Sequence, residues 1–148
     1  MQVMNTLFGA GMTSKLFVNI RERLSLCYSV GSSYYGTKGI ATVSAGIDFD
    51  KEQQTREEVM QQLQACKNGQ ITQEELTAAK ETLLSSLRAT HDAPSSIEGY
   101  YATAALSGME MNPDQYMAAV EAVTKEQVVA AANTLQLHST YFLKGDRP

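Results

Sequence analysis

The sequence predicts an α+β domain, with a small antiparallel β-sheet and helices layered on one of its faces. Two observations predict this class. Runs with strand character at 28–35 and 40–49 flank Gly36-Thr37-Lys38-Gly39, a loop of hairpin length and composition. Segments with helical spacing occupy most of the remaining chain. A chain of 148 residues that is 43% hydrophobic can bury a core without disulfides or metals, so we expect one domain over 1–148.

The first element is an apolar segment, 1–8, which reads as the tail of a helix or strand and is broken at Gly9-Ala10-Gly11. Thr13 or Ser14 is then a plausible N-cap for an amphipathic helix. The apolar stripe of this helix is Leu16, Phe17, Ile20 and Leu24. Helix N-termini attract anions, but the glycine turn has neither a Walker nor a dinucleotide spacing, so we interpret it as a tight backbone turn.

Arg21 and Tyr28 are the candidate binding residues. Arg21 lies about 40° beyond the edge of the apolar stripe, so its guanidinium can reach out from the rim of the surface on which the helix packs. Tyr28 follows seven residues later, at the start of the first strand. A guanidinium and a hydroxyl in these positions can converge on one polar ligand group. The alternative is that Arg21 pairs with a neighbouring carboxylate or carbonyl.

The second strand alternates between apolar residues and small or polar residues. The apolar set is Ala41, Val43, Ala45, Ile47 and Phe49, and the other set is Thr42, Ser44, Gly46 and Asp48. This pattern predicts one face packed on helices and one face open to water or to a chamber. On the first strand we interpret Tyr34 and Tyr35 as half-buried packing residues.

The rest of the chain is predicted to be mainly helical. Thr72 and Glu75 form a capping box, and Asn112-Pro113 marks another helix start. The expected helices are 51–67, about 73–90, 95–108, one that starts after Asn112, and 124–135. A last strand, 139–144, is expected to return to the sheet.

Composition excludes several classes of function. The net charge of −4 without a Lys/Arg cluster argues against nucleic acid as the main partner. No apolar run approaches the roughly 20 residues of a membrane span, and the N-terminus lacks the pattern of a signal peptide. Cys27 and Cys66 are too few for a disulfide framework or a zinc motif, which fits a reducing compartment, so we expect a cytoplasmic location.

The run LFGAGMTSKLFVNIRERLSLCYSV, 7–30, resembles the second-half domain of the pitrilysin/insulinase family of zinc metallopeptidases, the inverzincins. The shared pattern is a glycine-rich loop, Ser-(Arg/Lys)-Leu-Phe, an Arg-bearing helix, then a small residue and Tyr. The segments ITQEELTAAKETLLSSL and VTKEQVVAAANTL and a last strand ending in Lys144-Gly145-Asp146 extend the resemblance over nearly the whole chain. It implies the metalloenzyme fold shared by LuxS and the processing peptidases.

The resemblance also implies roles for individual residues. Arg21 and Tyr28 match a family pair that faces the zinc across a closed chamber and holds the substrate backbone, with the Tyr near the scissile carbonyl. The residue before this Tyr is commonly Gly or Ala in the family, whereas here it is Cys27. We therefore expect Arg21 and Tyr28 to be substrate-binding residues for a peptide.

The zinc motif of the family, His-x-x-Glu-His, is missing from this sequence. That motif places two histidines four residues apart on one helical face, with the Glu as general base. The histidines here, His91 and His138, are too far apart to share such a face. His91-Asp92 is not read as a catalytic dyad, because adjacent residues in a turn rarely face each other. We expect no catalytic and no metal-binding residue in this chain, and zinc only in a partner half.

Two functional hypotheses follow. The chain is the non-zinc-binding half of an insulinase-like peptidase and helps to clamp a peptide substrate, while a half in the same polypeptide or a separate subunit carries the zinc. The alternative is a domain of a catalytically inactive family member that acts as a structural or partner subunit. The family has a strand before the segment 1–8, so we expect a fragment of the second half, or a sheet completed otherwise, for example in a homodimer.

Overall fold

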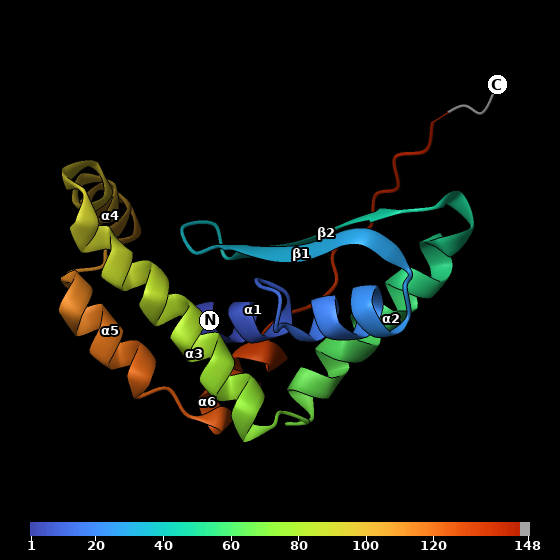
Figure 1. Ribbon diagram of the computed structural model, residues 1–148, viewed down its shortest axis with the longest axis horizontal. Coiled ribbons are helices and arrows are strands. Elements are labelled where there is room, and N and C mark those ends of the chain that lie inside the picture. The colour runs from blue at the N-terminus through green and yellow to red at the C-terminus, as the bar shows by residue number, and fades with distance from the viewer. Residues whose placement is uncertain (146–148) are drawn as a thin grey trace.

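The computed structural model describes residues 1–145, and Asp146 of the predicted last strand lies outside this range. The elements in chain order are α1 (Gln2–Phe8), the π-helix η1 (Phe17–Arg23), β1 (Cys27–Tyr35), β2 (Ile40–Ile47), the short 3-10 helix η2 (Phe49–Lys51), α2 (Glu52–Lys67), α3 (Gln73–Arg88), the 3-10 segment η3 (Ala89–Asp92), α4 (Pro94–Ser107), α5 (Pro113–Glu121) and α6 (Lys125–Asn133). The β1–β2 hairpin forms one layer above α1 and η1, and α3, α4 and α5 extend to one side of it (Figure 1). This arrangement confirms the α+β class.

The sheet is a two-stranded antiparallel hairpin, and its register defines its two faces. Ser32 on β1 is buried against the helices and lies opposite Val43. Residues directly opposite each other point to the same face, and neighbours alternate. The face away from the helices therefore carries only small side chains along the middle of the hairpin, in the pairs Ser29 with Gly46, Gly31 with Ser44, and Ser33 with Thr42.

Two expectations about strands are wrong. The segment 139–144 forms no strand; it leaves α6 as extended chain and touches the hairpin region where Lys144 lies 5.5 Å from the ring centre of Phe49. The apolar face of the second strand does not pack on helices, because α1 and η1 contact β1 and leave β2 as an outer strand. Val43 is consequently 38% exposed, and Ala41 and Ala45 are exposed as well. Periodicity indicates which side chains share a face but not whether another element covers it.

The core is built around α1, the most deeply enclosed helix. All of its residues from Val3 to Phe8 are buried, including the polar Asn5 and Thr6, because α3, β1, α6 and α2 contact it. A helix that is buried on every side needs apolar residues on most of its surface, which is what the segment 1–8 provides. The surrounding elements contribute Leu16, Ile20, Leu26, Leu63, Cys66, Ile71, Leu76, Ala79, Leu84, Leu87, Val120, Val128 and Ala132.

The glycine turn after α1 touches β1 directly. The N–H of Ser32 donates to the carbonyl oxygen of Gly9 at 3.0 Å, and the Ser32 hydroxyl donates to Oδ1 of Asn5 at 2.8 Å. A Cβ on Gly9 would lie 2.6 Å from Oγ of Ser32 and 2.7 Å from Cδ1 of Leu16. Only glycine fits where the turn meets the strand, so the turn is a backbone contact, as the sequence indicates.

A buried ion pair joins the start of the η1 segment to the start of α3. Lys15 is only 8% exposed, and its Nζ lies 2.6 Å from Oε1 of Glu75. The other oxygen of Glu75 accepts the N–H of Thr72 at 2.8 Å, and the N–H of Glu75 donates to Oγ1 of Thr72 at 3.1 Å. The predicted capping box is thus confirmed, and its glutamate also neutralises the buried lysine.

Substitution of Gly9 by Ala should lower the free energy of unfolding by about 1–3 kcal/mol, because the new methyl group overlaps Ser32 and Leu16. Urea denaturation measures this change. The matched control is Gly99→Ala in α4, where an added Cβ meets nothing within 4 Å; it should stabilise the helix by about 0.5–1 kcal/mol. Equal effects at the two positions would contradict the close approach.

Removal of the buried cation by Lys15→Ala should cost about 1–3 kcal/mol in the same assay, because Glu75 then lacks its ionic partner. The control is Arg88→Ala, which removes an exposed pair with Glu81 at 3.7 Å. Such a pair contributes at most about 1 kcal/mol. A loss at Lys15 no larger than the loss at Arg88 would show that the buried pair does not stabilise the fold.

Candidate functional site

Arg21 lies near the end of η1, where it is held against an aromatic ring. Its guanidinium carbon is 4.7 Å from the ring centre of Phe17, one helical turn earlier. The only other charge pair in which Arg21 takes part within residues 1–145 is with Glu22, at 3.8 Å and on the exposed surface. Exposed pairs of this length contribute little, so the stacking on Phe17 sets the position of the guanidinium. The Arg21 side chain is 43% exposed and can take a ligand.

Tyr28 is placed by an irregularity in β1. Cys27 lies opposite Ile47 and Ser29 opposite Gly46, so Tyr28 is the extra residue of a β-bulge. Its side chain is 70% exposed, and its hydroxyl donates to Oδ1 of Asp48 at 2.7 Å. This hydrogen bond and the negative charge of Asp48 raise the pKa of the Tyr28 phenol.

The two predicted binding residues lie on either side of Cys27. The carbonyl oxygen of Ile20, just before Arg21, accepts the N–H of Leu26, just before Cys27, at 2.9 Å, so the end of η1 lies beside the start of β1. Burial raises the pKa of the Cys27 thiol, and the positive charge of Arg21 acts in the opposite direction. Tyr28 is the next residue on the strand. The structure thus brings Arg21 and Tyr28 to the same end of the hairpin, where each has its own partner, Phe17 and Asp48 respectively.

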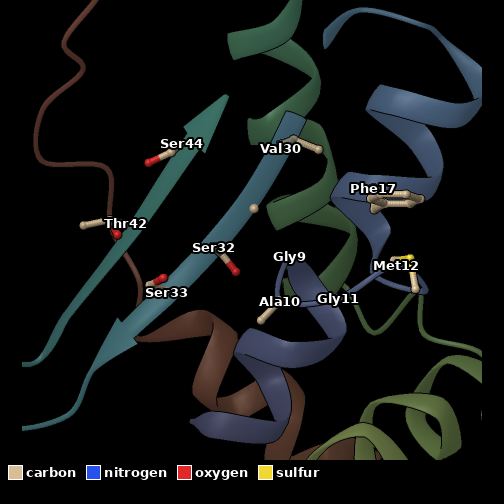
Figure 2. A pocket seen from close by; sticks show the side chains of 11 residues that line it. Gly9, Ala10, Gly11, Met12, Phe17, Val30, Ser32, Ser33, Thr42 and Ser44 are labelled. Carbon is tan, nitrogen blue, oxygen red and sulfur yellow. The ribbon is translucent and has the colours of Figure 1, made fainter. Parts of the chain in front are cut away.

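A cavity of about 440 Å³ lies on the open face of the hairpin, which carries Gly31, Ser33, Thr42 and Ser44, and the glycine turn and η1 border it at the free edge of β1 (Figure 2). One wall is the Phe17 ring that supports Arg21. The lining has no charged side chain and consists mainly of backbone and small residues: Gly9, Ala10, Gly11, Met12, Phe17, Val30, Gly31, Ser32, Ser33, Thr42 and Ser44. The cavity therefore offers main-chain groups and hydroxyl groups to a ligand. The positive charge of Arg21 lies beside Phe17, which lines the cavity.

Phe17 and Asp48, the partners of Arg21 and Tyr28, are not singled out by the sequence pattern. A signal exists for Phe17, which stands four positions before Arg21 and so shares its side of a helix. Its place in the apolar stripe hides this second contact. No local signal existed for Asp48, because its contact with Tyr28 depends on a bulge that shifts the register at the end of the hairpin.

The described side chains, those of residues 1–145, do not gather into a zinc site. His91 lies 3.5 Å from Asp114 through its Nε2, an exposed contact between η3 and α5. Among residues 1–145, no three or more His, Cys, Asp or Glu side chains gather in an arrangement that could hold a metal. None of the helices in this same range combines the length and apolar composition needed to cross a membrane.

Comparison with known protein families shows to which family this chain belongs. The model of the peptidase M16 inactive domain matches residues 1–83, which include α1, the glycine turn, η1, the hairpin and α2. The chain belongs to the peptidase M16 family. This confirms the family resemblance seen in the sequence.

Curated relatives of this M16 domain include both a probable inactive metalloprotease and zinc proteases. This chain is 34% identical over 145 residues to YmfF, a probable inactive metalloprotease of Bacillus subtilis, and the match covers 98% of this chain and 34% of the relative. It is 28% identical over 137 residues to an uncharacterized zinc protease of Rickettsia bellii, covering 90% of this chain and 33% of the relative. The chain spans about a third of the length of each.

Solved structures show the same fold. A conserved protein of Enterococcus faecalis superimposes with a TM-score of 0.82 at 28% identity, over 89% of this chain and 31% of the other. A protease of Helicobacter pylori superimposes with a TM-score of 0.78 over 90% of this chain and 33% of the other. At 19% identity the second likeness concerns the fold alone.

The position of Arg21 can be tested through the neighbouring thiol. Iodoacetamide at mildly alkaline pH should modify Cys27 well before Cys66, because burial raises the pKa of Cys66 to about 11. Arg21→Ala should slow the modification of Cys27 by about two- to threefold, since the nearby positive charge stabilises the thiolate. Mass spectrometry of timed samples gives both rates. Arg23→Ala is the control, and an equal slowing there would contradict the placement of Arg21.

Proposed function

We propose that this M16 inactive domain is the non-zinc half of a peptidase-type clamp and binds an extended peptide along the cavity and the Arg21–Tyr28 end of the hairpin. The observation that carries the proposal is the shared wall: the Phe17 ring lines the cavity and also supports the Arg21 guanidinium. A ligand in the cavity would meet uncharged backbone and small side chains first, and the arginine at the rim. That combination suits a polypeptide main chain better than a phosphorylated ligand.

The chemistry available to this domain is binding. Arg21 offers several N–H donors to peptide carbonyl oxygens. The lining of the cavity holds no Asp, Glu, His, Lys or Cys side chain that could act as a general base. Cleavage of a peptide would therefore require a second half that carries His-x-x-Glu-His, in the same polypeptide or in another subunit. Zinc bound there would supply the Lewis acid and the activated water.

A second candidate function is that of a structural or partner subunit without proteolysis. It is favoured by the name of the Bacillus subtilis relative, a probable inactive metalloprotease. In that case the assembly would hold peptides, or its own partner, and cleave nothing. Cys27 and Cys66 are both free thiols, so for either function we propose the cytoplasm as the compartment.

The decisive variant is Arg21→Ala. It should weaken binding of a fluorescein-labelled unstructured β-casein peptide to this protein by about 10-fold, as expected for the loss of a charged hydrogen bond. Fluorescence anisotropy measures the affinity. In an assembly with a zinc-bearing half, the same variant should lower peptide turnover and leave the zinc content unchanged.

The matched control is Arg23→Ala, two residues along η1. Arg23 is 63% exposed and pairs with Glu58 at 3.9 Å, away from the cavity lining. Loss of binding in both variants would indicate a nonspecific charge effect. Unchanged binding and turnover in Arg21→Ala would refute the role proposed for Arg21. Peptide binding with no metal-dependent cleavage in any assembly would favour the partner-subunit function.

A further inference from the structure

We infer that Asp48 is a positioning residue that keeps the Tyr28 hydroxyl as a hydrogen-bond acceptor, so that Tyr28 receives a backbone N–H of the bound peptide instead of donating to a carbonyl oxygen. The inference rests on the proposed peptide-binding function and deepens it. It differs from the role that the family resemblance implies for this tyrosine, which places the side chain near the scissile carbonyl.

The first step is the geometry of the hairpin end. In a regular hairpin the side chain of Tyr28 would follow the alternation of β1, but the bulge between Cys27 and Ser29 adds a residue and re-aims it. Asp48 follows β2 immediately, one residue after Ile47, the partner of Cys27. The bulge thus places a phenol and a carboxylate from the two strands within 2.7 Å of each other.

The second step is a count of protons. A phenol has one hydroxyl proton, and an ionised carboxylate can only accept. The proton between Tyr28 and Asp48 must therefore come from Tyr28, and the oxygen of Tyr28 keeps only lone pairs for any other partner. Tyr28 is 70% exposed, so these lone pairs are open to a ligand. A ligand that contacts this oxygen without breaking the bond to Asp48 must bring a donor.

The third step concerns the neighbouring charges. Asp50, in η2, adds a second negative charge that acts on Tyr28, and Arg21 lies on the other side of Cys27. Arg21 can only donate, whereas Tyr28 in this state can only accept. An extended peptide presents N–H and C=O groups together along each edge. Arg21 and Tyr28 therefore complement both kinds of group on a single peptide edge.

The test compares a labelled β-casein peptide with versions in which one backbone amide at a time is N-methylated, which removes a donor. The wild-type protein should bind one of the methylated peptides about 3- to 10-fold more weakly than the unmethylated peptide, because that peptide lacks the N–H that bonds to Tyr28. In Tyr28→Phe the difference at that position should vanish. Asp48→Asn should abolish it too, because the asparagine amide can donate to the phenol oxygen and release the phenol proton.

The matched controls are Tyr35→Phe, an exposed tyrosine at the other end of β1, and Asp50→Asn, the adjacent carboxylate. Both should keep the wild-type discrimination. Phenolate absorbance during a pH titration gives a readout without peptide: the pKa of Tyr28, identified by its absence in Tyr28→Phe, should fall in Asp48→Asn because the accepting carboxylate is gone.

The outcomes separate the two proposals. If wild type binds no peptide, the proposed function fails, and the peptide role of Asp48 fails with it. If wild type binds but Asp48→Asn keeps the same preference for the unmethylated amide, only the role of Asp48 is overturned. An unchanged Tyr28 titration in Asp48→Asn would likewise overturn it. Circular dichroism of each variant shows that loss of discrimination is not loss of the fold.

Discussion

The pairing of Lys15 with Glu75 is the constraint on which the arrangement of this domain depends. A lysine that is almost fully buried needs a negatively charged partner. Glu75, in the first turn of α3, is that partner, so α3 must begin beside Lys15. This fixes the start of the η1 segment relative to α3, against which α1 packs. In the run Ser14-Lys15-Leu16-Phe17, three residues are buried parts of the framework and only Phe17 faces the cavity.

Local signals made much of the fold predictable from the sequence. The capping box at Thr72 starts its helix as expected, and the hairpin turn lies where its glycines indicate. The features that could not be predicted depend on partners far away in the sequence. The exposed face of β2 and the unpaired segment 139–144 are examples, because alternation is the same whether or not another element covers a strand.

In the candidate site, too, local features could be predicted and contacts between distant residues could not. Arg21 and Tyr28 could be selected from their spacing and from the family pattern, and the structure places them at one end of the hairpin. Their roles as binding residues remain predictions. Their immediate partners depend on two irregularities, the π-helix and the β-bulge, neither of which has a signature in residue type alone.

The π-helix has a consequence for how this surface can evolve. The N–H of Leu24 bonds the carbonyl of Asn19, five residues back, so each hydrogen-bonded turn of this segment spans one more residue than in an α-helix. Deletion of a single residue here would restore α-helical winding and leave the elements before and after the segment in place. A different side chain would then stand where Arg21 now does, with the framework around Lys15 left intact.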